Sequence, residues 1–352
     1  DKETFWAWFQ AQSAVFHHAV IMHEQIETEF FDPLSAWLER MHDGIYFLAG
    51  EAETGVAELI FTAEGVYKNF AFIEDLVATA PALTGWRFVA LKPACPVEGF
   101  GINMGERTYS DQTMQFYARE QTRLPHNVDI TIVHGDEAAT EEQLTSGVYV
   151  YLDNLLGEWV AVTQIDQLHI IPPSVATQPL LPMADLLPYL QQKHAEWQQA
   201  YAHVYHNSDQ DDFVSFEGEA ENGQLIVGII DSTLLAWPHK PSHPWMLTLH
   251  IAYDGNGLNG MPSKQVYQHM EAFEDAVMAE LPEHEGYLNL GRETGDGVRL
   301  VYIACKQFVQ ATRVLERLMP QFTQDMSIEY DLFQDKYWQS LQRFEHMDTE
   351  AD

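Results

Sequence analysis

Apolar residues recur at helical spacing over the first stretch of the chain, from Phe5 to Phe30. This pattern predicts one long helix or two broken ones. Asp32-Pro33 then supplies an N-cap residue followed by proline at the first helical position, and apolar residues at helical spacing follow it. We therefore predict a second helix that begins near Asp32.

The next stretch changes to short apolar runs separated by turn residues. The runs near Ile45–Ala49 and Ala57–Thr62 predict a β-hairpin, since polar and glycine residues separate them. A helical pattern follows and stops at Pro81, and a last apolar run covers Trp86–Leu91. With the helix near Asp32, these elements give the order α-β-β-α-β.

The C-terminal third repeats this order. A helix opens at Pro262-Ser263, a hairpin covers Tyr287–Tyr302, a helix stops at Pro320, and a strand covers Met326–Phe333. An additional strand, Trp245–Tyr253, precedes this copy and completes the β-α-β-β-α-β order of a ferredoxin-like unit. We predict an internal duplication in which the upstream copy takes its missing strand from later in the chain.

The middle of the chain is predicted to extend the first sheet, with strands at Val128–His134, Val148–Leu152 and Trp159–Ile171. The polar run His206–Asp212 suggests a domain boundary. The fold class is thus α+β. Residues 1–205 form an N-terminal domain, with the first ferredoxin-like unit at about 32–93 and an extension at 94–205. Residues 206–352 form a C-terminal ferredoxin-like domain with an added N-terminal hairpin.

The charge of the chain limits its partners. Its 352 residues carry 53 acidic and 18 basic side chains, a formal net charge of −35. Such a field repels nucleic-acid phosphates and anionic membranes, and it attracts basic protein surfaces. We expect no direct contact with nucleic acid or membrane. Two readings stay open, a strongly solvated surface and an acidic face that binds a protein with a basic surface.

The cysteines and the apolar runs predict a cytoplasmic location. Cys95 and Cys305 are far apart and form no CxxC pattern, which favours reduced thiols over a disulfide framework. The first residues lack the basic and apolar regions of a signal peptide. No run approaches the roughly 18 apolar residues that a membrane helix requires.

Several short motifs resemble bacterial proteins of domain-of-unknown-function family 695. In the second half they are His243-Pro244-Trp245, Tyr253-Asp254-Gly255, Gly260-Met261-Pro262, Gly291-Arg292-Glu293-Thr294 and Lys336-Tyr337-Trp338. In the first half they are Gly85-Trp86, Ala90–Pro93, Asp129–His134 and Leu152–Glu158. The resemblance covers nearly the whole chain, and the family has no established activity or catalytic residues to transfer.

The C-terminal module also resembles the regulator of ribonuclease activity B family. That family consists of small acidic proteins that bind and inhibit an RNA-degrading enzyme. The resemblance rests on element order and acidity rather than on a shared motif, so it implies protein binding only by analogy.

Metal and nucleotide motifs are incomplete, so we expect no metal and no cofactor. Asp209-Gln210-Asp211-Asp212 has Phe213 and Ala220 where a calcium loop needs ligands. The histidine pairs His203/His206 and His239/His243 each lack an obvious third ligand in the sequence. No Rossmann, P-loop or nucleophile-elbow pattern is present.

Two arginines are the first candidates for binding because basic residues are rare in this chain. Arg292 and Arg299 lie on the downstream hairpin, where they could pair with Glu293, Asp296 or Glu285 or else recognise an anion. A proline-stiffened aromatic loop precedes the adjacent strand. The binding candidates are therefore Arg292, Arg299, Glu293, Trp237, His239, His243 and Trp245.

These observations favour a non-catalytic binding or regulatory protein that acts through protein-protein contacts. A nucleic-acid-processing enzyme or a toxin would be the kind of protein that it inhibits. The alternative is a small-molecule enzyme or ligand-binding protein with a site at the interface of the two halves, where pockets commonly form. The sequence identifies no catalytic residue, and the oligomeric state stays open.

Overall fold

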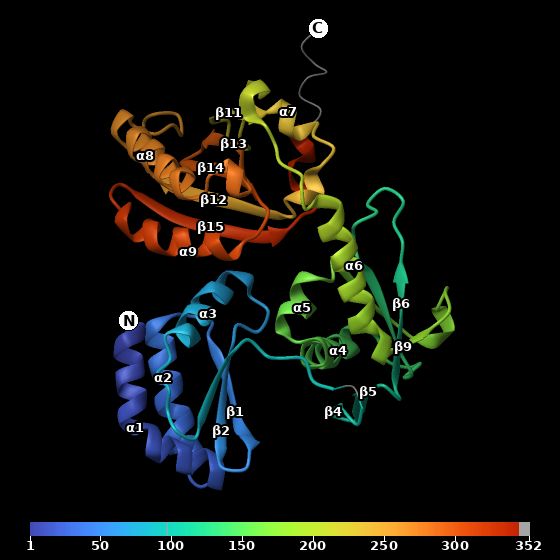
Figure 1. Ribbon diagram of the computed structural model, residues 1–352. Helices are drawn as coiled ribbons and strands as arrows, with labels where there is room; N and C mark the ends of the chain where they lie inside the picture. The colour runs from blue at the N-terminus through green and yellow to red at the C-terminus, as the bar shows by residue number, and fades with distance from the viewer. Residues whose placement is uncertain (97, 345–352) are drawn as a thin grey trace. The chain divides into compact units, whose positions relative to one another are not determined.

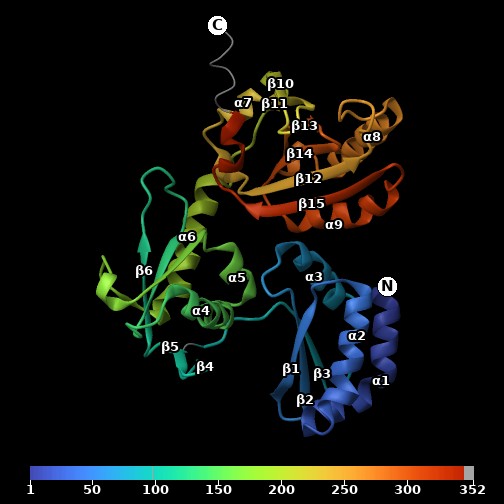
Figure 2. The same cartoon turned by 180° about the vertical axis from the view of Figure 1, so that it is seen from behind.

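The computed structural model describes residues 1–96 and 98–344, and the chain divides into two units (Figures 1 and 2). Unit 1 is Asp1–Ala195 and unit 2 begins at Glu196. The division lies inside helix α6 (Leu186–Tyr201). The polar run that predicted a boundary begins later, at His206. Val97 and residues 345–352 of the predicted domains lie outside the described residues.

Unit 1 begins with helices whose aromatic side chains pack against a sheet. They are α1 (Lys2–Met22), the π-helix η1 (Glu27–Phe31) and α2 (Asp32–Met41). Phe5, Phe9 and Phe16 of α1 are buried, as their helical spacing predicts. The ring of Trp6 lies 4.7 Å from that of Phe88, and Trp6 Nε1 donates to the carbonyl oxygen of Leu76.

The first sheet has three strands in the part of the chain that the structure describes. They are β1 (Tyr46–Glu53), β2 (Val56–Thr62) and β3 (Trp86–Ala90), in the order β1-β2-β3. β1 and β2 are antiparallel, whereas β2 and β3 are parallel and joined through η2 (Tyr67–Asn69) and α3 (Phe70–Ala78). The predicted order α-β-β-α-β is therefore present, but no later strand of the described residues joins this sheet.

A second, separate sheet occupies the rest of unit 1, which corrects the prediction that these strands extend the first sheet. Its order is β8-β7-β6-β9. The strands are β6 (Met114–Arg119), β7 (Asp129–His134), β8 (Gln167–Ile171) and β9 (Leu181–Pro182), and a hairpin of β4 (Gly101–Met104) and β5 (Arg107–Ser110) precedes them. Residues of this sheet and of helices α4 (Glu141–Leu156) and α6 form one core cluster.

The predicted strand at Val148–Leu152 is wrong, because these residues lie in α4. Val and Tyr residues alternate here, a pattern typical of strands, yet Leu144, Val148, Tyr151 and Leu155 are buried at helical spacing. Thr140 and Gln143 form a capping box that starts this helix. Similarly, the predicted strand Trp159–Ile171 begins as helix α5 (Glu158–Thr163) and becomes β8 only at Gln167.

A buried carboxylate joins the ends of the first sheet to α5. Glu158 is fully buried and accepts hydrogen bonds from Thr62 Oγ1 at 2.7 Å and from the backbone N–H of Ala63 at 3.0 Å. The N–H groups of Gly65 and Lys92 also donate to it, at 3.1 and 3.2 Å. These uncharged donors satisfy a carboxylate that would otherwise be costly to bury.

Unit 2 contains a six-stranded antiparallel sheet in the order β10-β11-β13-β14-β12-β15. The strands are β10 (Phe213–Glu219), β11 (Leu225–Asp231), β12 (Trp245–Tyr253), β13 (Tyr287–Gly295), β14 (Val298–Cys305) and β15 (Met326–Gln334). Helices α8 (Lys264–Glu280) and α9 (Val309–Leu318) contact each other and connect strands of the sheet. The β-α-β-β-α-β order from β12 to β15 agrees with the predicted order, and β10 and β11 form the added hairpin.

Two short segments help to cover unit 2. The helix α7 (Ser232–Leu235) and the 3-10 helix η9 (Gln339–Phe344) contribute Leu234 and Leu341 to a core cluster with strand residues such as Met246. The C-terminal half of α6 is tied to this unit, since Trp197 Nε1 donates to the carbonyl oxygen of Pro241 at 2.8 Å.

Among the described residues, no helix is both long and apolar enough to cross a membrane.

The α-β-β-α-β order thus occurs twice, in different sheets. In unit 2, β12 lies between β14 and β15, whereas in unit 1 β3 pairs directly with β2. Strands β14 and β15 are each antiparallel to β12, so they run parallel to each other, as β2 and β3 do. The duplication itself stays a prediction.

Candidate functional site

The two candidate arginines share one carboxylate, and it is none of the predicted partners. Glu274 lies on α8; its Oε1 accepts from Arg299 Nη1 at 2.6 Å and its Oε2 accepts from Arg292 Nη1 at 2.7 Å. Only 1% of the Arg299 side chain and 6% of that of Glu274 are exposed. Arg299 Nε also donates to Thr294 Oγ1. Arg299 is therefore an internal group, while Arg292 is 30% exposed and also reaches Glu271.

Glu293 lies apart from these arginines, because adjacent residues of β13 point to opposite faces of the sheet. Its carboxylate accepts from the Tyr302 hydroxyl at 2.5 Å and pairs with Arg343 of η9. Arg343 Nη2 also donates to the Tyr302 hydroxyl oxygen. Burial raises the pKa of Tyr302, and its bond to Glu293 raises it further. The three side chains attach η9 to the sheet.

The aromatic and histidine candidates come together around Trp237. Its ring lies 5.7 Å from that of His239 and 5.6 Å from that of His243. His239 is exposed, but only 2% of His243 is exposed. Burial lowers the pKa of His243 to about 3, and the nearby charges of Lys306 and His206 act in the same direction. His243 is thus a neutral core residue, with its Nδ1 hydrogen-bonded to Ser242 Oγ at 2.8 Å.

Trp245 is separate from this group. It is 6% exposed and its ring packs 4.3 Å from that of Phe308 at the start of α9. The structure therefore brings three of the four loop candidates together, and it places the fourth in the core.

A histidine and two aspartates meet beside Trp237, and sequence reasoning missed this cluster. The potential ligand atoms of His206, Asp211 and Asp231 all lie within 4.8 Å of one another. His206 Nε2 is 2.6 Å from Asp211 Oδ1, and the imidazole ring lies 5.4 Å from that of Trp237. The register of the β10–β11 hairpin places Phe213 opposite Asp231. Extending the predicted hairpin by this register would have brought Asp211 near Asp231.

The environment of Asp231 is unusual for a carboxylate. The residue is fully buried, and its Oδ1 caps α7 by accepting from the N–H of Leu234 at 3.0 Å. Among the described residues, no hydrogen-bond donor reaches Oδ2. Burial raises the pKa of Asp231 to about 6, although the bond from Leu234 opposes this change and the Asp211 carboxyl adds to it. Its hydrogen-bonding capacity is therefore incompletely used.

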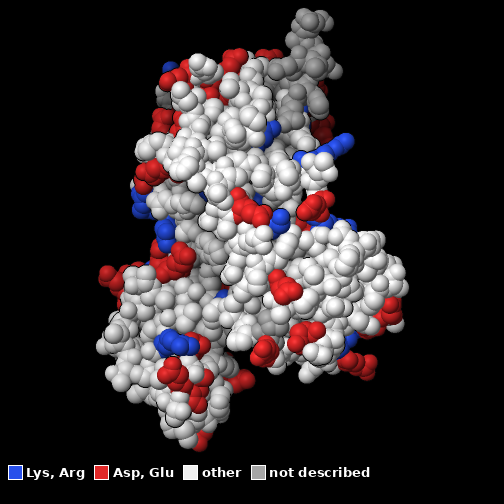
Figure 3. All heavy atoms as spheres, turned by 45° about the vertical axis from the view of Figure 1, so that its right-hand side comes forward, with Lys and Arg blue, Asp and Glu red and all other residues white. Residues whose placement is uncertain are grey.

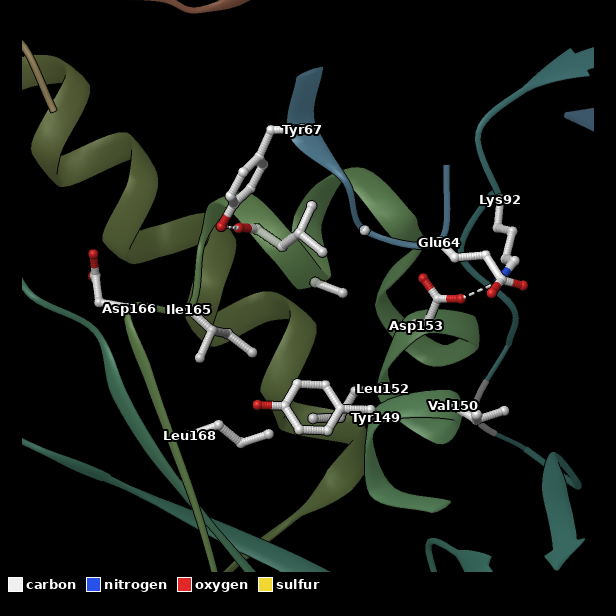
Figure 4. Close-up of a pocket in the computed structure, with 13 residues that line it drawn as sticks. Glu64, Tyr67, Lys92, Tyr149, Val150, Leu152, Asp153, Ile165, Asp166 and Leu168 are labelled. Atoms are coloured by element: carbon white, nitrogen blue, oxygen red, sulfur yellow. Dashed lines mark hydrogen bonds and ion pairs between the residues drawn. The ribbon is translucent and has the colours of Figure 1, made fainter. Parts of the chain in front are cut away.

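Unit 1 contains a pocket of about 440 Å³ lined by residues of α4, α5 and the segments beside them. Figure 4 shows Glu64, Lys92 and Asp153 together on one side and Tyr67 on the other. Lys92 Nζ donates to Asp153 Oδ2 at 2.6 Å, and the Tyr67 hydroxyl donates to the carbonyl oxygen of Val162 at 2.8 Å. The remaining labelled lining is largely apolar, with Tyr149, Val150, Leu152, Ile165 and Leu168.

The charges in this pocket are mainly negative. Lys92 is paired with Asp153, whereas Glu64 and Asp166 bring further carboxylates to the lining. Burial raises the pKa of Asp153; the Lys92 ammonium lowers it, and Glu158 and Glu64 add to the increase. The pocket thus offers an apolar surface beside acidic groups.

The surface carboxylates form no single patch on the face that Figure 3 displays. Asp and Glu side chains occur there in small separated groups, with fewer Lys and Arg side chains between them. On this face the acidic side chains are therefore dispersed rather than concentrated at one point.

A family model covers most of unit 2. Residues 219–344 match DUF695, a family of unknown function. The DUF695 segment begins at the last residue of β10 and ends with η9. It includes Asp231 and both candidate arginines, while His206 and Asp211 precede it. No curated protein and no solved structure matches the chain.

The DUF695 match covers less of the chain than the motifs suggested. Gly85-Trp86, Asp129–His134 and Leu152–Glu158, on which the whole-chain resemblance rested, lie outside it. The matches support neither a bacterial origin nor the resemblance to the regulator of ribonuclease activity B family.

Proposed function

We propose that this protein is a non-catalytic binding or regulatory module whose partner has a basic surface. The observation that carries this proposal is a difference between basic and acidic side chains: the candidate arginines are paired inside unit 2, whereas carboxylates are exposed on the displayed surface. Arg299 and Arg292, the best candidates for recognising an anion, are both paired with Glu274. Carboxylates in contrast occur in many places on the displayed surface. An acidic surface attracts cationic partners and increases their rate of association.

The dispersal of the carboxylates on the displayed face favours long-range attraction over one tightly complementary patch there. Exposed charges more than about 8–10 Å apart are largely screened at physiological salt, so affinity should fall as salt is added. A cytoplasmic enzyme that binds nucleic acid through a basic groove is the kind of partner that fits this charge.

Salt-dependent capture tests the proposal. The purified chain is immobilised and exposed to cell extract at low and at high salt, and the captured proteins are identified and then purified for affinity measurements. We expect a partner with a basic surface whose affinity falls steadily with salt concentration. A partner bound equally well at both salt concentrations, or no partner at either one, would contradict the proposal.

The pocket in unit 1 supports a second candidate function, the binding of a small amphiphilic amine. Its apolar lining suits an alkyl or aromatic group. Because Lys92 is paired with Asp153, the Glu64 carboxylate could pair with the ammonium group of a ligand. We infer that a carboxylate ligand of the same length is rejected, because like charges repel at short range.

Matched ligands distinguish this candidate from protein binding. Octylamine and octanoate are titrated calorimetrically into the full chain, its Glu64→Gln variant and a Tyr205→Ala control in unit 2. We expect octylamine alone to bind, and to bind more weakly to Glu64→Gln than to the control. Equal binding of both ligands, or no binding of either, would exclude this use of the pocket.

A further inference from the structure

We propose that His206, Asp211 and Asp231 bind a divalent first-row transition-metal ion such as Zn²⁺. The three potential ligand atoms lie within 4.8 Å of one another. Ligand atoms bound at about 2.0–2.2 Å from one ion lie about 3–3.5 Å from one another. His206 Nε2 and Asp211 Oδ1, now 2.6 Å apart, would separate by less than about 1 Å, and the other ligand atoms would move closer to complete the site.

The buried carboxylate is an independent sign of a ligand. Asp231 is fully buried, and no donor among the described residues reaches its Oδ2. A second carboxylate, that of Asp211, lies beside it with a side chain only 10% exposed. Two carboxylates in such surroundings require a proton or a cation between them, because burying unpaired negative charge is costly.

The donor set selects the class of ion. One imidazole nitrogen and two carboxylate oxygens suit Zn²⁺, Mn²⁺ or Fe²⁺, whereas Ca²⁺ and Mg²⁺ prefer oxygen ligands alone. Three protein ligands leave coordination positions for water. The His206 side chain is only 6% exposed, so bulk solvent has little access to an ion at this position.

The position of the cluster suggests what the ion does. His206 and Asp211 lie on the segment after α6, while Asp231 ends β11 and caps α7. An ion bound to all three would fasten this segment to the end of the β10–β11 hairpin. Metal binding would thereby stabilise the edge of the sheet in unit 2.

Metal titration of the untagged full chain tests the site. After treatment with a chelator, the chain is titrated calorimetrically with Zn²⁺, Mn²⁺, Mg²⁺ and Ca²⁺, and bound metal is counted by mass spectrometry. The variants are Asp231→Asn and His206→Ala. The matched controls are Asp209→Asn and His203→Ala, because both of these residues are exposed and close in sequence to the ligands.

We expect the native chain and both controls to bind one Zn²⁺ at this site, and Mg²⁺ and Ca²⁺ to bind far more weakly. Each ligand variant should lose more affinity than the roughly 10- to 100-fold that loss of an outer hydrogen-bond partner costs. Binding by Asp231→Asn equal to that of the native chain, or no transition ion bound by the native chain, would overturn the proposal.

Hydrogen exchange of the native chain decides the matter if a ligand variant does not fold. Added Zn²⁺ should slow exchange of the amides in β10, β11 and residues 206–212. Slowing confined to other segments, or no slowing, would also overturn the proposal.

Discussion

Among the described residues, each unit buries one glutamate, Glu158 on α5 and Glu274 on α8, but the two carboxylates are satisfied in different ways. Glu158 of unit 1 accepts from a hydroxyl and three backbone N–H groups, whereas Glu274 of unit 2 accepts from two arginines. Glu158 is therefore satisfied by dipoles alone, whereas Glu274 is part of an ionic cluster. The loss of either carboxylate should consequently have different effects.

The hairpins explain why only unit 2 needs the ionic cluster. In both hairpins a glycine with positive φ, Gly55 or Gly297, is followed by a valine. The next buried residue is Ala57 in unit 1 and Arg299 in unit 2. A methyl group at this position needs no partner, while a guanidinium group there requires a carboxylate from the helix above the sheet.

Removing Glu274 should produce the largest effect. Glu274→Ala leaves the buried charge of Arg299 without its carboxylate, and loss of one partner of a buried pair costs about 3–5 kcal/mol. Hydrogen exchange of the β13 and β14 amides measures this loss within unit 2. Arg317→Ala is the control, since its pair with Glu280 is largely exposed and should contribute about 0–1 kcal/mol. Equal effects would contradict the comparison.

Removing Glu158 should have a somewhat smaller effect and should act in unit 1. Glu158→Ala leaves at least Thr62 Oγ1 and the N–H of Ala63 without an acceptor in a buried environment. We expect a loss of about 2–4 kcal/mol, because each unsatisfied buried group costs about 1–3 kcal/mol. Faster amide exchange should follow in β2 and β3, with unchanged exchange in β13. Faster exchange in β13 instead would contradict this assignment.

Acid should weaken unit 2 through His243. The folded pKa is about 3, below the ordinary value of about 6.5, so the unfolded chain takes up a proton first as the pH falls. The contribution of His243 is complete above pH 6.5 and should decrease by about 3 kcal/mol between pH 7 and pH 4. Exchange of the β12 amides over this range measures the change. In a His243→Gln variant, the stability of unit 2 should depend less on pH. An exchange profile equal to that of the native chain would contradict the role of His243.

The smallest effect is expected from Arg292. Arg292→Ala removes a 30% exposed side chain and leaves Arg299 paired with Glu274, so we expect a loss of about 1 kcal/mol or less. Arg299→Ala should cost more stability, because it removes the hydrogen bond to Thr294 and leaves a cavity in the core. Amide exchange of β14 in the two variants checks the difference, and equal losses would show that burial does not separate the two arginines.

Local sequence patterns predicted most elements, because turns, proline stops and apolar periodicity are encoded over a few residues. The order from β12 to β15 followed from such signals. The alternation Val148-Tyr149-Val150-Tyr151 was misleading, since the helical spacing of Leu144, Tyr151 and Leu155 outweighs strand propensity once they pack in a core. Strand pairing was harder still, because whether a middle strand joins the first sheet depends on contacts between distant residues.

Site residues were harder to predict than elements. Chemical type alone made Arg292 and Arg299 look alike, and only their positions against Glu274 separate an internal group from a partly exposed one. The partner on α8 could not be named without the packing of this helix on the sheet. The cluster of His206 with Asp211 and Asp231 could have been reached from the register of the hairpin that was predicted at the start of the C-terminal domain.

Helix α6 has a practical consequence for dividing the protein. A C-terminal fragment cut at the polar run, beginning at residue 206, would lose Trp197 and its hydrogen bond to Pro241. It would also lose Tyr201, which is 9% exposed and lies near Tyr337. A fragment that begins at Leu186 keeps the whole helix. Gene truncation, limited proteolysis and crystallisation of the DUF695 segment should therefore start upstream of α6 rather than at the charge-rich sequence that follows it.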